Sequence, residues 1–176
     1  MTGAHIFVDE TKRRDYLLVA AVTLPAEQRA LRAMIRGLTL PGQRRLHMKS
    51  ESDPRKRMIA SAIVDAGVRA TVYNAGSSYK NERDRRAACL QALVQDAARR
   101  RDELLIIEED QTLRRWDQQR LIELTRAADC QSLRYEHRTA AQEQLLALPD
   151  AIAWCVAKGG DWLRRIDPCV ETVIDV

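Results

Sequence analysis

The feature that most constrains the fold of this sequence is an unbroken aliphatic run, Leu104-Leu105-Ile106-Ile107, followed directly by three acidic residues. A strand that is apolar at every position is typical of a sheet covered on both faces, whereas a half-exposed strand alternates apolar and polar residues. The run therefore predicts a central strand of a sheet that lies between two layers of helices.

The rest of the chain alternates strand-like and helix-like segments. Further strands are expected at residues 4–9, 16–24, 45–49, 68–73 and 133–137, and helices at residues 25–36, 53–67, 81–100, 113–128 and 142–158. A short polar segment separates the first two strands, which predicts an antiparallel hairpin. We therefore expect one α/β domain over residues 1–176, a mixed sheet with an N-terminal β-hairpin and helices on its faces. Residues 170–176 could form a terminal strand or an interface segment.

Composition excludes several classes of protein. Charged residues make up 31% of the chain and hydrophobic residues 45%, which is typical of a folded globular domain rather than a disordered one. No apolar stretch approaches the roughly 20 residues that a membrane span needs, and the first residues lack the apolar core of a signal peptide. We expect a cytoplasmic protein without a membrane partner. The four cysteines are scattered singly, which argues against a zinc knuckle or a dithiol redox centre.

The net charge of +4 comes largely from clustered arginines. The clusters are Arg44/Arg45, Arg83/Arg85/Arg86, Arg99/Arg100/Arg101, Arg114/Arg115 and Arg164/Arg165. The guanidinium group is well shaped for bidentate contact with phosphate. The clusters therefore indicate nucleic acid as the partner, with Arg83, Arg86 and Arg100 as candidate substrate-binding residues. A plain solvated helix face would have the same composition.

Carboxylates stand at three special places along the chain. Asp9 and Glu10 end the first strand, and Glu108 begins the acidic run that ends the aliphatic strand. Asp150 is the only charged residue in the apolar segment 145–155. A charge among apolar neighbours has to be neutralised, paired or bound to a cation. Each position also has an ordinary explanation: a turn residue, a solvated strand end, or an acid in the first turn of a helix.

Taken together, the three positions predict a metal site. Magnesium or manganese prefers oxygen ligands, and two ions about 3.5–4 Å apart can hold the attacking and leaving oxygens of a phosphodiester. We expect Asp9, Glu108 and Asp150 to be the ligands, with Glu10 or Glu109 completing the site as further catalytic acids. The alternation of the strand does not decide between Glu108 and Glu109. Clusters of histidine and cysteine that would indicate zinc are absent from the sequence.

His47 and Lys49 would share one face of the expected strand at 45–49, because alternate side chains of a strand point to the same side. Either side chain could contact a substrate phosphate, and His47 could transfer protons. Both could equally be ordinary surface residues.

The order of these motifs resembles the ribonuclease H-like superfamily, and more narrowly a widespread bacterial domain family of unknown function within it. The motifs that carry the resemblance are Phe7-Val8-Asp9-Glu10-Thr11, Leu46-His47-Met48-Lys49 and Leu146-Ala147-Leu148-Pro149-Asp150. Members of that family usually have Ser where this chain has Thr11, and Ala where it has Pro149. The resemblance implies a ribonuclease H-like fold and metal-dependent cleavage of a phosphodiester.

Two other functions remain open from the sequence. A non-catalytic module on the same scaffold would bind nucleic acid or protein, and Trp116, Trp154 and Trp162 could then mark an interface. A nucleotide phosphohydrolase would use the same carboxylates. The segment Gly76-Ser77-Ser78 lacks the Gly-Lys-Ser/Thr of a phosphate-binding loop, which argues against a kinase or GTPase. The sequence leaves the oligomeric state open, a homodimer included.

Overall fold

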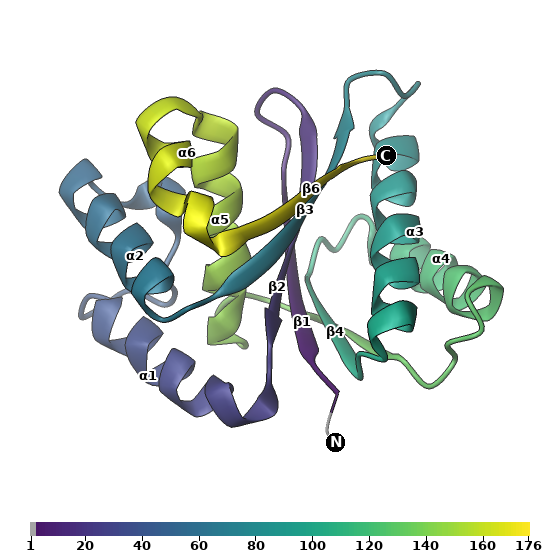
Figure 1. The fold of residues 1–176 in the computed structure, drawn as a ribbon, viewed down its shortest axis with the longest axis horizontal. Coiled ribbons are helices and arrows are strands. Elements are labelled where there is room, and N and C mark those ends of the chain that lie inside the picture. Colours follow the sequence, from purple (N-terminus) through teal and green to yellow (C-terminus); the bar gives the residue numbers. More distant parts are fainter. Residues whose placement is uncertain (1–2) are drawn as a thin grey trace.

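Six strands form one mixed sheet in a computed structural model that describes residues 3–176 (Figure 1). The strands are β1 (His5–Thr11), β2 (Tyr16–Thr23), β3 (Arg69–Gly76), β4 (Leu104–Glu108), β5 (Arg134–Arg138) and β6 (Val170–Asp175). The helices are α1 (Gln28–Leu38), α2 (Asp53–Asp65), α3 (Glu82–Arg100), α4 (Arg114–Ala127), α5 (Ala147–Lys158) and α6 (Gly160–Ile166). The predicted class, a single α/β domain that opens with a hairpin, is confirmed.

The strand order is β5–β4–β1–β2–β3–β6. β2 pairs antiparallel with both β1 and β3, whereas the pairs β1–β4, β4–β5 and β3–β6 are parallel. The aliphatic strand β4 lies in the interior of the sheet, and its residues 104–107 are all buried. This confirms the expectation that it is covered on both faces.

Two hydrophobic cores lie on opposite faces of the sheet, because successive side chains of each strand point to opposite sides. Phe7, Val19 and Ile106 belong to the core beneath α1, α2, α5 and α6. Val8 and Leu105 belong to the core beneath α3 and α4. Figure 1 shows the two groups of helices on either side of the sheet.

The expectation of a strand at residues 45–49 is wrong. This segment is extended at His47, but it joins no sheet and turns into a short 3₁₀ helix that begins at Met48. Leu46 and Met48 are both buried in the core, so His47 and Lys49 do lie on the more exposed side of the segment, as expected. The Met48 backbone N–H donates to the side chain of Asp150 at 2.8 Å instead of to a neighbouring strand.

The C-terminal part of the chain also differs in detail from expectation. The last predicted helix, at 142–158, begins later, at Ala147, after a separate 3₁₀ turn. It ends at Lys158 as expected, and Gly159 after it has a φ of 73°. α6 was not expected. Residues 170–175 form the edge strand β6, which decides between the two possibilities for this segment. None of the helices within residues 3–176 combines the length and the apolar character that crossing a membrane requires.

Candidate functional site

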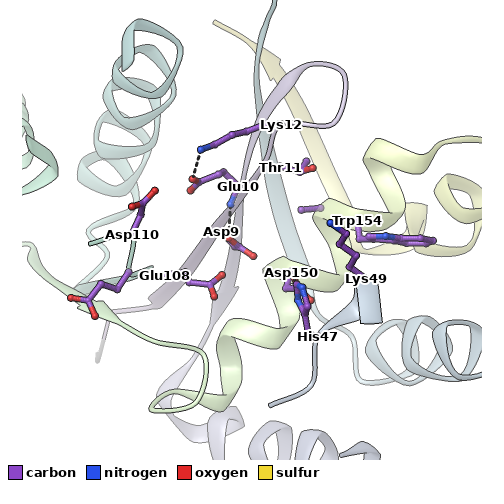
Figure 2. Close-up of a pocket in the computed structure, with 12 residues that line it drawn as sticks. Asp9, Glu10, Thr11, Lys12, His47, Lys49, Glu108, Asp110, Asp150 and Trp154 are labelled. Atoms are coloured by element: carbon purple, nitrogen blue, oxygen red, sulfur yellow. Dashed lines mark hydrogen bonds and ion pairs between the residues drawn. The ribbon is translucent and has the colours of Figure 1, made fainter. Parts of the chain in front are cut away.

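A pocket of about 340 Å³ lies where the ends of β1 and β4 meet α5. Its lining residues are Asp9, Glu10, Thr11, Lys12, His47, Lys49, Glu108, Glu109, Asp110, Asp150, Ala153 and Trp154. In Figure 2 the carboxylates of Asp9, Glu108 and Asp150 point into a common space, and His47 lies beside Asp150. The fold therefore brings together three acidic positions that are up to 141 residues apart in the sequence.

Strand pairing explains why Asp9 and Glu108 meet. β1 and β4 run parallel, with Val8 opposite Ile107, so the next residues along the two strands are Asp9 and Glu108. Both acids share the sheet face that α5 covers, because Phe7 and Ile106, two residues before them, pack in that core. The relative alignment of the two strands thus favours Glu108 over Glu109, a choice that the alternation of β4 alone left open.

Asp150 reaches the pocket from the first turn of α5. One of its oxygens accepts the hydrogen bond from the Met48 N–H, and the other lies 3.1 Å from Nδ1 of His47. Asp150 therefore pairs, as expected of a charge on an apolar helix, and it also fixes the segment that carries His47.

The surroundings of Asp9 disfavour its charged form. Asp9 is only 9% exposed, and burial raises the pKa of its carboxyl well above the usual range, with further contributions from Glu108, Asp150 and Glu10. Glu108 has a cationic partner, since Arg45 Nη1 lies 2.6 Å from its Oε1. Among residues 3–176, Asp9 forms no ion pair, and its Oδ1 accepts only the N–H of Glu10. A strongly perturbed acid in a pocket is typical of a functional site.

The donor set suits a divalent cation in kind, because it consists of carboxylate oxygens crowded in a partly buried space. The side chains as packed do not form a ready-made site: within residues 3–176, no group of three or more His, Cys, Asp or Glu side chains is arranged to hold a metal ion. The Glu108 carboxylate already accepts a hydrogen bond from Arg45, and the Asp150 carboxylate is already bound to the Met48 N–H and to His47. A cation held by Glu108 would compete with Arg45 for this carboxylate.

The other expected catalytic acids line the pocket but have partners of their own. Glu10 binds Arg86 at 2.6 Å, and Lys12 lies 3.5 Å from its second oxygen. Glu109 pairs with Arg114 at 2.7 Å. His47 and Lys49 also line the pocket, although they come from an extended segment and a 3₁₀ turn rather than from the expected strand.

None of the three arginines expected to bind substrate lines this pocket. Arg83 is exposed on the first turn of α3, and Arg100, at the other end of that helix, pairs with Asp102. Arg86 is fully buried, and a guanidinium group enclosed in the core cannot reach a phosphate. The expectation that Arg86 contacts the substrate is therefore wrong. Lys12 and Lys49 do line the pocket, and Arg45 contacts it through Glu108.

Arg86 is instead the centre of a buried polar network. Its guanidinium group donates to both carboxylate oxygens of Asp117 at 2.7 Å, to Glu10 at 2.6 Å and to the Tyr16 hydroxyl at 3.1 Å. Nε2 of His137 lies 3.1 Å from the same Asp117. The network joins β1, α3, α4 and β5 beneath the pocket and holds Glu10 in place.

Sequence reasoning missed Arg45 and Trp154 as residues of the site. Arg45 belongs to an arginine pair visible in the sequence, but only its contact with Glu108 relates it to the pocket. Trp154 lies one helical turn after Asp150 and packs edge-on against Trp162, with ring centroids 5.0 Å apart. Lys56 Nζ lies 4.5 Å from the Trp154 ring centroid, which holds the indole in place.

We predict that Arg86→Met destabilises the protein by about 3–5 kcal/mol, because it leaves the fully buried Asp117 without its bidentate partner. Urea unfolding measures the loss. Arg83→Met, on the exposed side of the same helix, is the matched control and should change the free energy of unfolding by less than about 0.5 kcal/mol. Equal effects of the two substitutions would contradict the structural role of Arg86.

We also predict that Asp9→Asn raises the melting temperature at pH 7 in the presence of a chelator. The folded-state pKa of Asp9 is raised, so its ionisation costs stability as the pH rises above the unfolded value near 3.8. The gain should disappear below that pH, where the wild-type carboxyl is protonated in both states. Asp161→Asn is the control: Arg165 lowers the pKa of Asp161, and this substitution should give no stabilisation. A less stable Asp9→Asn variant at neutral pH would contradict the raised pKa of Asp9.

Comparison of the chain with models of known protein families, with curated proteins and with solved structures finds no match. A function for this protein therefore has to be inferred from its own residues and their arrangement.

Proposed function

We propose that this protein is a metal-dependent nuclease of the ribonuclease H-like kind, which hydrolyses a phosphodiester bond in RNA or DNA. The observation that carries the proposal is the convergence of Asp9, Glu108 and Asp150 in one pocket. They come from a hairpin strand, a later strand end and a C-terminal helix, which is the distribution of acids that the resemblance implies. Burial and the neighbouring carboxylates raise the pKa of Asp9, and a bound cation would favour its charged form.

The chain's own residues have distinct roles in this proposal. Asp9, Glu108 and Asp150 would hold one or two magnesium or manganese ions, which supply an activated water and charge stabilisation on the phosphate when bound. His47, oriented by Asp150 at 3.1 Å, lies at the pocket where it can hold or release a proton. Lys12 and Lys49 line the same pocket and attract the phosphate group.

A second function has a specific observation in its favour. Glu108 and Asp150 already bind Arg45, His47 and the Met48 N–H, so the carboxylates of the pocket are partly satisfied without a cation. A module that binds nucleic acid or protein without catalysis would not need a cation at these carboxylates. The two functions differ in their response to metal ions.

The nuclease proposal predicts that saturating Mn²⁺ raises the melting temperature by several degrees, since a ligand at 100 times its dissociation constant adds about 2.7 kcal/mol. Asp9→Asn and Asp150→Asn should abolish this shift. They should also reduce Mn²⁺-dependent cleavage of a labelled oligonucleotide by more than the roughly 10–100-fold that loss of an outer-shell partner costs.

Glu123→Gln is the control for that experiment. Glu123 is an exposed carboxylate on α4 outside the pocket, and its removal should leave both the thermal shift and the cleavage unchanged. Binding of the oligonucleotide without any response to Mn²⁺ would reject the nuclease and support the non-catalytic module. Full activity of either aspartate variant would reject the assigned ligands.

A further inference from the structure

A second groove, of about 440 Å³, adjoins the candidate site. It lies between the C-terminal half of α1, the loop at residues 39–46 and the start of α5. Arg45 lines this groove, and its guanidinium group binds Glu108, which lines the carboxylate pocket. The two cavities therefore meet at the Arg45–Glu108 ion pair.

The charge of the groove is opposite to that of the pocket. Arg36, Arg44 and Arg45 line it together with neutral residues, and its lining contains no aspartate or glutamate among the described residues. Its exposed apolar surface is supplied by Leu40 and Pro41. A ligand that fits both cavities therefore has to place negative charge in the groove and, under the proposed function, a phosphodiester in the acidic pocket.

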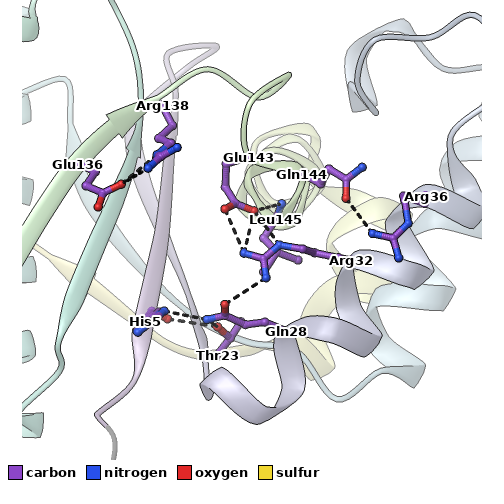
Figure 3. A network of polar contacts seen from close by, with 10 residues as sticks. All are labelled: His5, Thr23, Gln28, Arg32, Arg36, Glu136, Arg138, Glu143, Gln144 and Leu145. Carbon is purple, nitrogen blue, oxygen red and sulfur yellow. Dashed lines mark hydrogen bonds and ion pairs between the residues drawn. The ribbon is translucent and has the colours of Figure 1, made fainter.

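Two of these arginines lack an anionic partner within the described part of the chain. Arg36 donates only to the neutral side-chain oxygen of Gln144, at 3.3 Å, as Figure 3 shows. Arg44 is exposed and makes no side-chain hydrogen bond or ion pair within residues 3–176. Arg32, one turn before Arg36 on α1, is different: it forms a bidentate pair with Glu143 that anchors α1 to the turn before α5 (Figure 3). The structure thus neutralises Arg32 and leaves Arg36 and Arg44 available.

The loop that carries Arg44 is held in place by its own hydrogen bonds. The Gln43 side chain accepts from the Leu40 N–H and donates to the buried Glu51, both at 2.9 Å. Gly42 adopts a φ of 87°, a conformation that favours glycine, so the turn depends on this residue. Because the loop is already ordered, a ligand would not have to bear the full entropic cost of ordering it.

From this geometry we propose that the groove binds the sugar–phosphate backbone of the nucleic-acid strand whose phosphodiester occupies the carboxylate pocket. A strand of several nucleotides then occupies both cavities, whereas a mononucleotide or an isolated diester reaches only the carboxylate pocket. Arg36 and Arg44 contact backbone phosphates, for which the guanidinium fork is well shaped. Leu40 and Pro41 contact the sugars between these phosphates. This inference rests on the proposed nuclease function.

The test compares two double variants that remove the same charge. Arg36→Ala with Arg44→Ala removes the groove arginines. Arg29→Ala with Arg126→Ala removes two exposed arginines that line neither cavity. Fluorescence anisotropy measures binding of labelled single-stranded DNA and RNA of about 12 nucleotides, in chelator and from about 50 to 200 mM salt. A second assay measures Mn²⁺-dependent hydrolysis of the small diester bis(p-nitrophenyl) phosphate.

We expect the groove variant to reduce the salt dependence of binding, the slope of log K against log salt, by about 1.4 for at least one of the two strands. This figure corresponds to about 0.7 for each phosphate that an arginine no longer neutralises. The control variant should keep the wild-type slope. Hydrolysis of the small diester should be the same in all three proteins, because that substrate is too short to reach the groove.

The two proposals fail in different ways. Equal slopes for the groove and control variants, or a wild-type protein that binds neither strand, would overturn the groove. A groove variant that loses hydrolysis of the small diester would also overturn it, because the arginines would then act in the pocket itself. A wild-type protein that binds the strands but, with Mn²⁺, cleaves neither the strands nor the small diester would count against the nuclease, and the slopes would still decide the groove.

Discussion

The parallel pairing of β1 with β4 is the constraint on which the rest of the structure depends. It places Val8 beside Ile107 in the interior of the sheet, so that the acids after them emerge side by side at one edge. The same pairing gives the sheet its two buried faces, each covered by its own group of helices. A displacement by one residue would turn Glu108 to the opposite face and remove it from Asp9 and α5.

Asp9 and Glu10 are neighbours in the chain, but their side chains lie on opposite faces of the sheet and have different roles. Asp9 points toward α5, while Glu10 joins the buried network of Arg86. Asp9 lines the pocket with no cationic partner among residues 3–176. Glu10 is neutralised by Arg86, in a network that links the sheet to two helices. Arg45 and His47 pair with Glu108 and Asp150 from a segment that belongs to no strand. Of the three converging acids, only Asp9 lacks such a partner within residues 3–176, so it is the position best suited to gain from a cation.

Local patterns in the sequence predicted most of the architecture. The aliphatic run of β4, the hairpin and the order of strands and helices all follow from side-chain periodicity, which depends on neighbouring residues only. The failures have a common cause. Residues 45–49 have the alternation of a strand, but Leu46 and Met48 are buried by helices and the backbone binds Asp150 instead of a strand. Arg86 belongs to an arginine cluster that is typical of a basic surface. It is nevertheless buried in the core, where it pairs with Asp117 and Glu10, which are distant in the chain.

The sequence by itself determined the α/β class, the buried strand β4 and the three positions at which acids needed an explanation, because burial and periodicity are visible in adjacent residues. Only the tertiary structure decided that Asp9, Glu108 and Asp150 share one pocket and that Glu108, not Glu109, faces the other two. It also decided which arginines are free to meet a ligand. These depend on strand alignment and on ion pairs between residues more than 60 positions apart, such as Arg45 and Glu108, and no local pattern in a single sequence records such pairs.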